Sequence, residues 1–233
     1  MQQEQSVLRW GGLAGMLGSI VFIVVFVIVG VFVGDDPANI EGWVTRFPDI
    51  YTARLFENGL YLFVLVIWIP HMLALAYALR RAHLPLALFG SVISIVGLTI
   101  MIAGALTHVA VNPLYMLSQL PDMNTADQRS IALMWQATWG ILDALLIAGL
   151  LLVPFGIAGL GVAMSADDRF GKLYAGITVG LGSIGLLAAI GAMIAPESLI
   201  AAGAVFALIF FNFIIGWKTF RLGSQPIPLK IVA

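Results

Sequence analysis

Six long stretches of apolar residues, separated by short polar segments, dominate the chain. They cover residues of about 11–33, 57–79, 85–108, 135–163, 173–195 and 198–217. Each reaches the length of about 20 apolar residues that an α-helix needs to cross the hydrocarbon core of a bilayer. We therefore predict an all-α protein, a polytopic bundle of six transmembrane helices that forms one integral membrane domain over residues 1–233.

The composition excludes an ordinary soluble domain. The chain is 61% hydrophobic and only 10% charged, whereas soluble domains are about 25% charged. The first apolar stretch is longer than the hydrophobic region of about 7–15 residues in a signal peptide, so we expect it to be a retained helix. The chain has no cysteine, which excludes disulfides and thiolate chemistry.

The basic residues are sorted between the two sides of this alternating layout. One side holds Arg46, Arg54 and Arg129. The other side holds Arg9, Arg80, Arg81, Arg169, Lys172, Lys218, Arg221 and Lys230. Short loops rich in Lys and Arg stay in the cytoplasm during insertion. The N and C termini are therefore predicted to be cytoplasmic, with two larger loops on the outer side.

The outer loop of residues 34–56 carries a helical pattern of its own. Asp36 and Pro37 form a helix-start signal. Apolar residues then follow at the i, i+3, i+4, i+7 spacing of one helix face: Ile40, Trp43, Val44 and Phe47. We predict a short interfacial helix that Pro48 ends. In the second outer loop, Thr125 and Gln128 fit a capping box, so the fourth helix is expected to begin near residue 126 and to exceed the membrane thickness.

Asp143 is the one acidic residue well inside an apolar stretch, and it follows Trp139 by one helical turn. A charge at that depth costs about 2.5–3.5 kcal/mol on insertion scales, so we expect the carboxyl to be paired, protonated or in contact with water. His108 is the first partner we expect and Arg54 the second, with Glu57 beside Arg54 at the mouth of the second helix. Asp143 is thus a ligand or transport candidate, or a residue that fixes helix packing.

A second polar group is predicted deeper in the bundle. His71 and Asn212 lie at the same depth, about 20 Å from the outer side. Ser19, Ser94 and either Thr178 or Ser183 fall near that layer. Such a layer is either a hydrogen-bonded belt that sets helix register or a small polar cavity open to the cytoplasm, with His71 as a titratable gate.

Metal and cofactor sites find no support in the sequence. His71 and His108 are separated by roughly 15–20 Å along the bundle, so they cannot share one haem iron. The third histidine, His83, lies in a basic cytoplasmic turn. No histidine pair has helical spacing and no second intramembrane aspartate exists to form a catalytic pair. We predict no cofactor, no metal and no catalytic residues.

Two segments carry a family resemblance. They are the run from Arg9 to Gly18, rich in glycine, and the stretch from Gly149 to Gly161 that is followed by Ser165 and by Phe170-Gly171-Lys172-Leu173. Both resemble the bacterial membrane family called domain of unknown function 4386. The resemblance implies a six-helix architecture and a bacterial inner (cytoplasmic) membrane, and it implies no activity or residue role.

These observations lead to three hypotheses about function. The first is a non-enzymatic membrane protein that acts as an accessory or partner-binding subunit, because small residues recur on the first, third and fifth helices. Its partners are then the lipid bilayer and a membrane protein or a second copy, and not nucleic acid. The alternative is a small transporter or ligand-binding protein that uses the Asp143–His108 and His71–Asn212 groups. An enzyme that acts on lipid is a third possibility.

Overall fold

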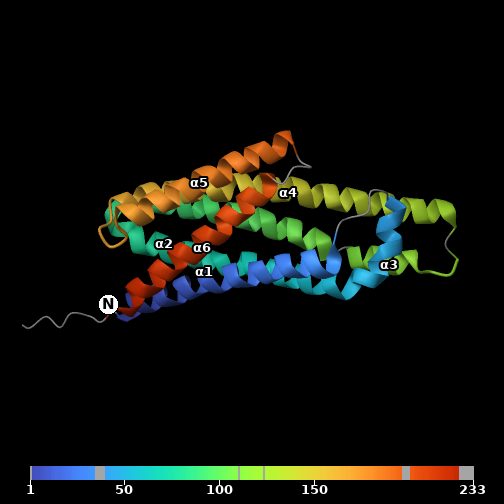
Figure 1. Ribbon diagram of the computed structural model, residues 1–233, viewed down its shortest axis with the longest axis horizontal. Coiled ribbons are helices and arrows are strands. Elements are labelled where there is room, and N and C mark those ends of the chain that lie inside the picture. Colours follow the sequence, from blue (N-terminus) through green and yellow to red (C-terminus); the bar gives the residue numbers. More distant parts are fainter. Residues whose placement is uncertain (1, 35–39, 110, 123, 196–199, 226–233) are drawn as a thin grey trace, which may run out of the picture.

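The structure is a computed structural model (Figure 1), and it describes residues 2–34, 40–109, 111–122, 124–195 and 200–225. All the secondary structure in these ranges is helical. In chain order the elements are α1 (Gln2–Ile28), the π-helical turn η1 (Val29–Val33), α2 (Ile40–Val109), α3 (Val111–Ser118), α4 (Thr125–Ser165), α5 (Gly171–Ile194) and α6 (Ile200–Ser224). In the described part of the chain, 5 helices are long and apolar enough to cross a membrane. The prediction of an all-α chain with long apolar helices is confirmed.

Helix α2 is a hairpin of two arms rather than one straight rod. His83 interrupts it with non-helical backbone angles, φ −154° and ψ 79°. Ser91 Oγ, beyond this point, donates a hydrogen bond of 3.1 Å to Met72 O before it. In a straight helix these residues would lie about 28 Å apart. The chain therefore folds back at His83, and the two arms carry the apolar stretches 57–79 and 85–108.

Helix α1, the two arms of α2 and helices α4, α5 and α6 form a closed ring in chain order, and we call them the six arms. Glycines bring the backbones of neighbouring arms close together. A Cβ atom on Gly11 of α1 would lie 2.1 Å from Ala74 Cβ of the first α2 arm. Further close approaches join the second α2 arm to α4 at Gly97, α4 to α5 at Gly182, and α5 to α6 at Gly191. Gly12 then closes the ring against α6. Such contacts suit lipid, where close van der Waals packing replaces the hydrophobic drive between helices.

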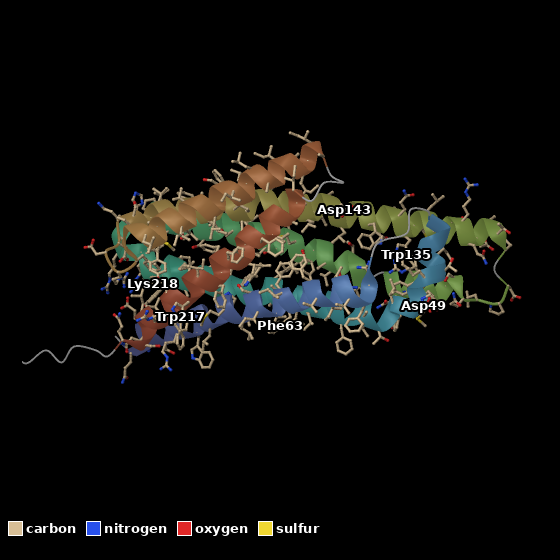
Figure 2. All side chains as sticks on the ribbon, in the orientation of Figure 1. Asp49, Phe63, Trp135, Asp143, Trp217 and Lys218 are labelled. Atoms are coloured by element: carbon tan, nitrogen blue, oxygen red, sulfur yellow. The ribbon has the colours of Figure 1, made fainter. Side chains whose placement is uncertain are left out.

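The two ends of the bundle differ in charge. The first residues of α1, the turn of α2 at His83, the turn between α4 and α5 and the end of α6 meet at one end, which we call the basic end (Figure 1). It carries Arg9, Arg80, Arg81, Arg169, Lys172, Lys218 and Arg221. At the opposite end, which we call the far end, lie α3 and the start of α4 (Figure 1). Figure 2 shows Lys218 and Trp217 toward the basic end and Asp49 and Trp135 toward the far end.

The segment predicted as the outer loop 34–56 is helical from Ile40 onward. Pro48 lies inside α2, so the prediction that it ends a separate short helix is wrong. A proline removes one backbone hydrogen bond and bends a helix without always ending it. In Figure 1 the light-blue first part of α2 runs across the other helices, and Figure 2 places Asp49 near the bend. The helix-start pair Asp36-Pro37 lies outside the described residues.

An aromatic cluster at the far end holds this first part of α2 against α3 and α4. Phe47 is buried between Tyr115 of α3, with ring centroids 5.0 Å apart, and Trp135 of α4, at 4.8 Å. Tyr51 contacts both Phe47 and Tyr115. Aromatic pairs at these distances contribute beyond simple burial. The cluster fixes the start of α2 relative to α4, and so it positions the charged residues that follow on α2.

Helix α4 is capped one residue earlier than the sequence suggested. Asn124 Oδ1 accepts a hydrogen bond from Asp127 N at 3.0 Å, and Asp127 Oδ2 accepts one from Asn124 N at 3.4 Å. The capping box is therefore Asn124 with Asp127, and the predicted pair of Thr125 and Gln128 is wrong. The helix that it starts runs for 41 residues to Ser165, which confirms the expected long fourth helix.

Replacing the cap is expected to loosen the first turn of α4. Asn124→Ala removes the acceptor for Asp127 N, and loss of such a cap costs about 1 kcal/mol. Amide hydrogen exchange over residues 125–128 should speed up by roughly fivefold. Thr125→Ala is the matched control and should leave exchange unchanged. Faster exchange in the Thr125 variant alone would contradict the assignment of the cap.

Candidate functional site

The predicted deep polar layer is fully buried. Ser19, His71, Ser94, Thr178 and Asn212 all have 0% exposed surface. Of the two α5 candidates, Thr178 is the buried one, whereas Ser183 is exposed. Buried polar side chains in a helical bundle need hydrogen-bond partners, and where those partners lie decides whether the layer is one site or several.

His71 lies where α1, the first α2 arm and α6 meet. Its Nδ1 atom is 3.0 Å from Gly11 O, and because a carbonyl oxygen only accepts, Nδ1 is the donor. Gly15 makes room for the ring, since a Cβ there would lie 3.0 Å from His71 Nδ1 and 2.8 Å from Asn212 O. The ring also contacts Phe211 of α6 at 6.0 Å. A single α1 glycine thus brings the predicted His71 and the backbone of the predicted Asn212 together.

This junction has hydrogen-bonding capacity that the described residues leave unused. His71 Nε2, Asn212 Oδ1 and the nearby Trp68 Nε1 are buried and have no hydrogen-bond partner among the described residues. Asn212 Nδ2 is used, in a 2.9 Å bond to Leu208 O of its own helix. The neutral His71 ring and the Asn212 carbonyl are acceptors, and the indole is a donor. The junction thus offers two acceptors and one donor that the described residues do not use.

Ser19 closes this junction, but the other two residues of the layer lie elsewhere in the ring. Ser19 Oγ is 3.0 Å from both Gly15 O and Ile209 O. Ser94 Oγ instead bonds Gly90 O and approaches Val153 O, at the interface of the second α2 arm with α4. Thr178 Oγ1 bonds Tyr174 O in α5. The layer is therefore three separate sites, and only the one around His71 combines several unused polar atoms.

The outer group of candidates is partly assembled at the far end. Arg54 Nη1 lies 2.9 Å from Glu57 Oε2, and both side chains are largely buried. The Arg54 guanidinium also lies over the Trp139 ring of α4, 5.4 Å from its centroid, within the range of a cation–π interaction. Arg54 thus contacts two other predicted residues, Glu57 of its own helix and Trp139 of α4.

Asp143 lies one helical turn beyond Trp139 on α4, and its side chain is exposed on the bundle surface (Figure 2). The side chain of His108 lies outside the described residues. The pairing of Asp143 with His108 therefore stays a prediction. Along α4, Trp135 is buried, Trp139 is half-buried and Asp143 is exposed.

The structure adds an ion network at the basic end that the sequence reasoning missed. Asp167, in the turn between α4 and α5, is 7% exposed. Its carboxylate accepts hydrogen bonds from Arg169 N at 2.9 Å and from the Arg169 guanidinium at 2.7 Å. Arg169 also donates to Ala78 O of α2 and lies 3.9 Å from Glu4 of α1, which is 3.7 Å from Arg80. One carboxylate–guanidinium pair thereby ties α1, the α2 hairpin and the α4–α5 turn together.

The protonation of this pair follows from the same contacts. Burial alone acts to raise the pKa of Asp167, but the hydrogen bonds from Arg169 and its positive charge outweigh burial and hold the pKa below its ordinary value. The bond to Asp167 correspondingly raises the pKa of Arg169. The sequence did contain a signal, since Glu4, Asp167 and Asp168 are the acidic residues that share an end with most of the basic ones.

In the described part of the chain, no group of three or more His, Cys, Asp or Glu residues is placed to hold a metal ion. No protein-family model, curated protein or solved structure matches the chain. The resemblance to domain of unknown function 4386 stays a prediction.

Proposed function

We propose that the protein is a non-enzymatic, six-pass membrane protein of the bacterial inner membrane that acts as a partner-binding subunit. The closed ring of six apolar arms supports six passes, with each α2 arm as one of them. The start of α1 and the end of α6 lie together at the basic end (Figure 1). Short basic loops stay in the cytoplasm, which supports cytoplasmic termini.

The observation that carries the partner-binding role is the open face of α5. Most glycines of the bundle pack against another helix, but a Cβ on Gly176 or Gly180 would meet nothing within 4 Å. The two glycines are four residues apart and so share a face of α5. Larger exposed side chains flank them, Leu173 on one side and Ile184 on the other. A notch of small residues between larger ones is how transmembrane helices dock closely.

No described residue fills this notch, so we assign it to a transmembrane helix of a partner protein. We expect the protein, extracted gently from its own membrane, to carry a stoichiometric protein partner in native mass spectrometry. Gly176→Leu combined with Gly180→Leu should fill the notch and release most of the partner, because each added side chain blocks close backbone approach.

Gly59→Leu is the matched control. Gly59 is also helical, and a Cβ on it would likewise meet nothing within 4 Å, but it has no small residue one turn away. This variant should keep the partner. A partner that stays bound to the double α5 variant contradicts the assignment of the face, and a homodimer in place of a hetero-complex identifies a second copy as the occupant.

A second function, a small transporter or ligand-binding protein, is favoured by one specific observation, the unused polar atoms of His71, Asn212 and Trp68. Transporters commonly bind polar substrate groups near the middle of the bilayer. The same mass spectra distinguish the two functions. A monomer that carries one defined small molecule, lost in Asn212→Leu, supports ligand binding and contradicts the partner-binding role.

A further inference from the structure

A groove at the basic end lies between the first turns of α1 and the last turn of α6. Its volume is about 420 Å³, and its lining includes Ser6, Arg9, Trp10 and Leu13 of α1 together with Gly223 of α6. Gly223 allows the two helices to meet there, since a Cβ on it would lie 2.6 Å from Arg9 N. The groove is therefore a built feature of the α1–α6 contact and not a gap between loose ends.

Among the described residues, the lining of the groove holds one positive charge, on Arg9, and no negative one. Arg80 and Arg169, at the same end, face the carboxylates of Glu4 and Asp167. Arg9 has no ion-pair partner within the described ranges, and its side chain is exposed. Ser6, one turn before Arg9 along the groove, adds a hydroxyl that is exposed as well. An unpaired guanidinium beside a hydroxyl is suited to a phosphate group, which guanidinium binds through parallel hydrogen bonds.

The chemistry changes from polar to apolar along the same face of α1. Trp10 is 71% exposed at the rim of the groove, and Leu13, Leu17 and Ile20 continue the face with 38%, 45% and 51% of their surface exposed. Indole rings favour the headgroup level of a bilayer, and exposed apolar side chains beyond them favour acyl chains. A ligand that fits the whole face has an anionic head and a hydrocarbon tail.

We propose that this groove binds the headgroup of an anionic phospholipid, with Arg9 on the phosphate, Ser6 on the phosphate or glycerol oxygens, Trp10 at the ester level and the acyl chain along Leu13 and Leu17. The proposal goes beyond the partner-binding role and does not depend on it, because the groove lies on α1 and α6 and the partner face on α5.

The test compares bound lipid in native mass spectra of the purified full chain. Phosphatidylglycerol and phosphatidylcholine are titrated separately in detergent, and we expect one phosphatidylglycerol to bind at least fivefold more tightly than phosphatidylcholine. Arg9→Gln should lower the preference for phosphatidylglycerol over phosphatidylcholine by about fivefold. Arg81→Gln, which removes an exposed charge at the same end but outside the groove, should retain it.

A second variant keeps the proposal testable if the Arg9→Gln protein fails to fold. Ser6→Asp adds a negative charge to an exposed groove position and should weaken phosphatidylglycerol binding while leaving phosphatidylcholine unchanged. Equal losses in the Arg9 and Arg81 variants, or equal binding of the two lipids by the unaltered protein, would overturn the proposal. Binding of inorganic phosphate as tight as that of phosphatidylglycerol would overturn it too, because the acyl chain would then contribute nothing.

Discussion

Gly12→Ala is expected to be among the most damaging single-methyl changes in the bundle. The added Cβ would lie 2.4 Å from Phe220 N and 2.6 Å from Gly216 O, both backbone atoms of α6. Backbone atoms cannot rotate away as the end of a side chain does, so α1 and α6 must separate. Overpacking of this kind costs about 1–3 kcal/mol or more. The yield of folded protein in detergent and its thermal unfolding midpoint should both fall.

The same substitution at Gly59 should have the opposite effect. A Cβ there meets nothing within 4 Å. Alanine is a better helix former than glycine by about 1 kcal/mol, so Gly59→Ala should keep or slightly raise the unfolding midpoint. If the two variants lose stability equally, the close contact of α1 with α6 does not hold the ring closed.

The second large effect is expected at the basic end. Arg169→Gln removes the cation that pairs with the buried Asp167 carboxylate at 2.7 Å. Leaving a buried charge unpaired costs several kcal/mol in a dry site, but the Arg169 side chain is 41% exposed and water replaces part of the lost contact. We therefore expect a loss of about 2 kcal/mol at pH 7. Lys172→Gln, on the exposed start of α5, is the control and should lose little.

The pH dependence follows from the same pair. The folded pKa of Asp167 is depressed, so the pair contributes stability that is fully present above the unfolded pKa of about 3.9 and is lost as pH falls below that value. The unfolding midpoint of the protein should drop between about pH 4 and the lower folded pKa, and Arg169→Gln should remove most of that drop. A drop of the same size in this variant would assign the acid sensitivity to other carboxyls.

The helices were predictable because lipid imposes a simple rule on sequence. A spanning helix must be apolar over a fixed length, and the predicted ends at 33 and near 163 agree with η1 ending at Val33 and α4 ending at Ser165. The depth of polar residues was also predictable, since rise per residue converts position into height. His71 and Asn212 were placed at one level in this way, and both are buried at the junction of α1, α2 and α6.

Contacts between helices were not predictable from that rule. Depth does not give the rotation of a helix, so Ser94 and Thr178 were placed in one layer with His71 although they face other interfaces. Short-range alternatives were also close in energy, as at α4, where Asn124 and Thr125 are both good caps and the chain uses Asn124. The structural role of the Asp167–Arg169 pair was missed because it depends on contacts of Arg169 with Ala78 and Glu4, which are distant in sequence.

The contact between α1 and α6 sets an order of events during synthesis. Every other interface of the ring joins helices that follow one another along the chain, so each can form as soon as its second member leaves the ribosome and enters the membrane. The Gly12 face of α1, and the junction that Ser19 and His71 share with α6, must wait until α6 is made. A chain that ends before residue 200 would therefore lack the α6 side of this contact and leave the Gly12 face of α1 uncovered.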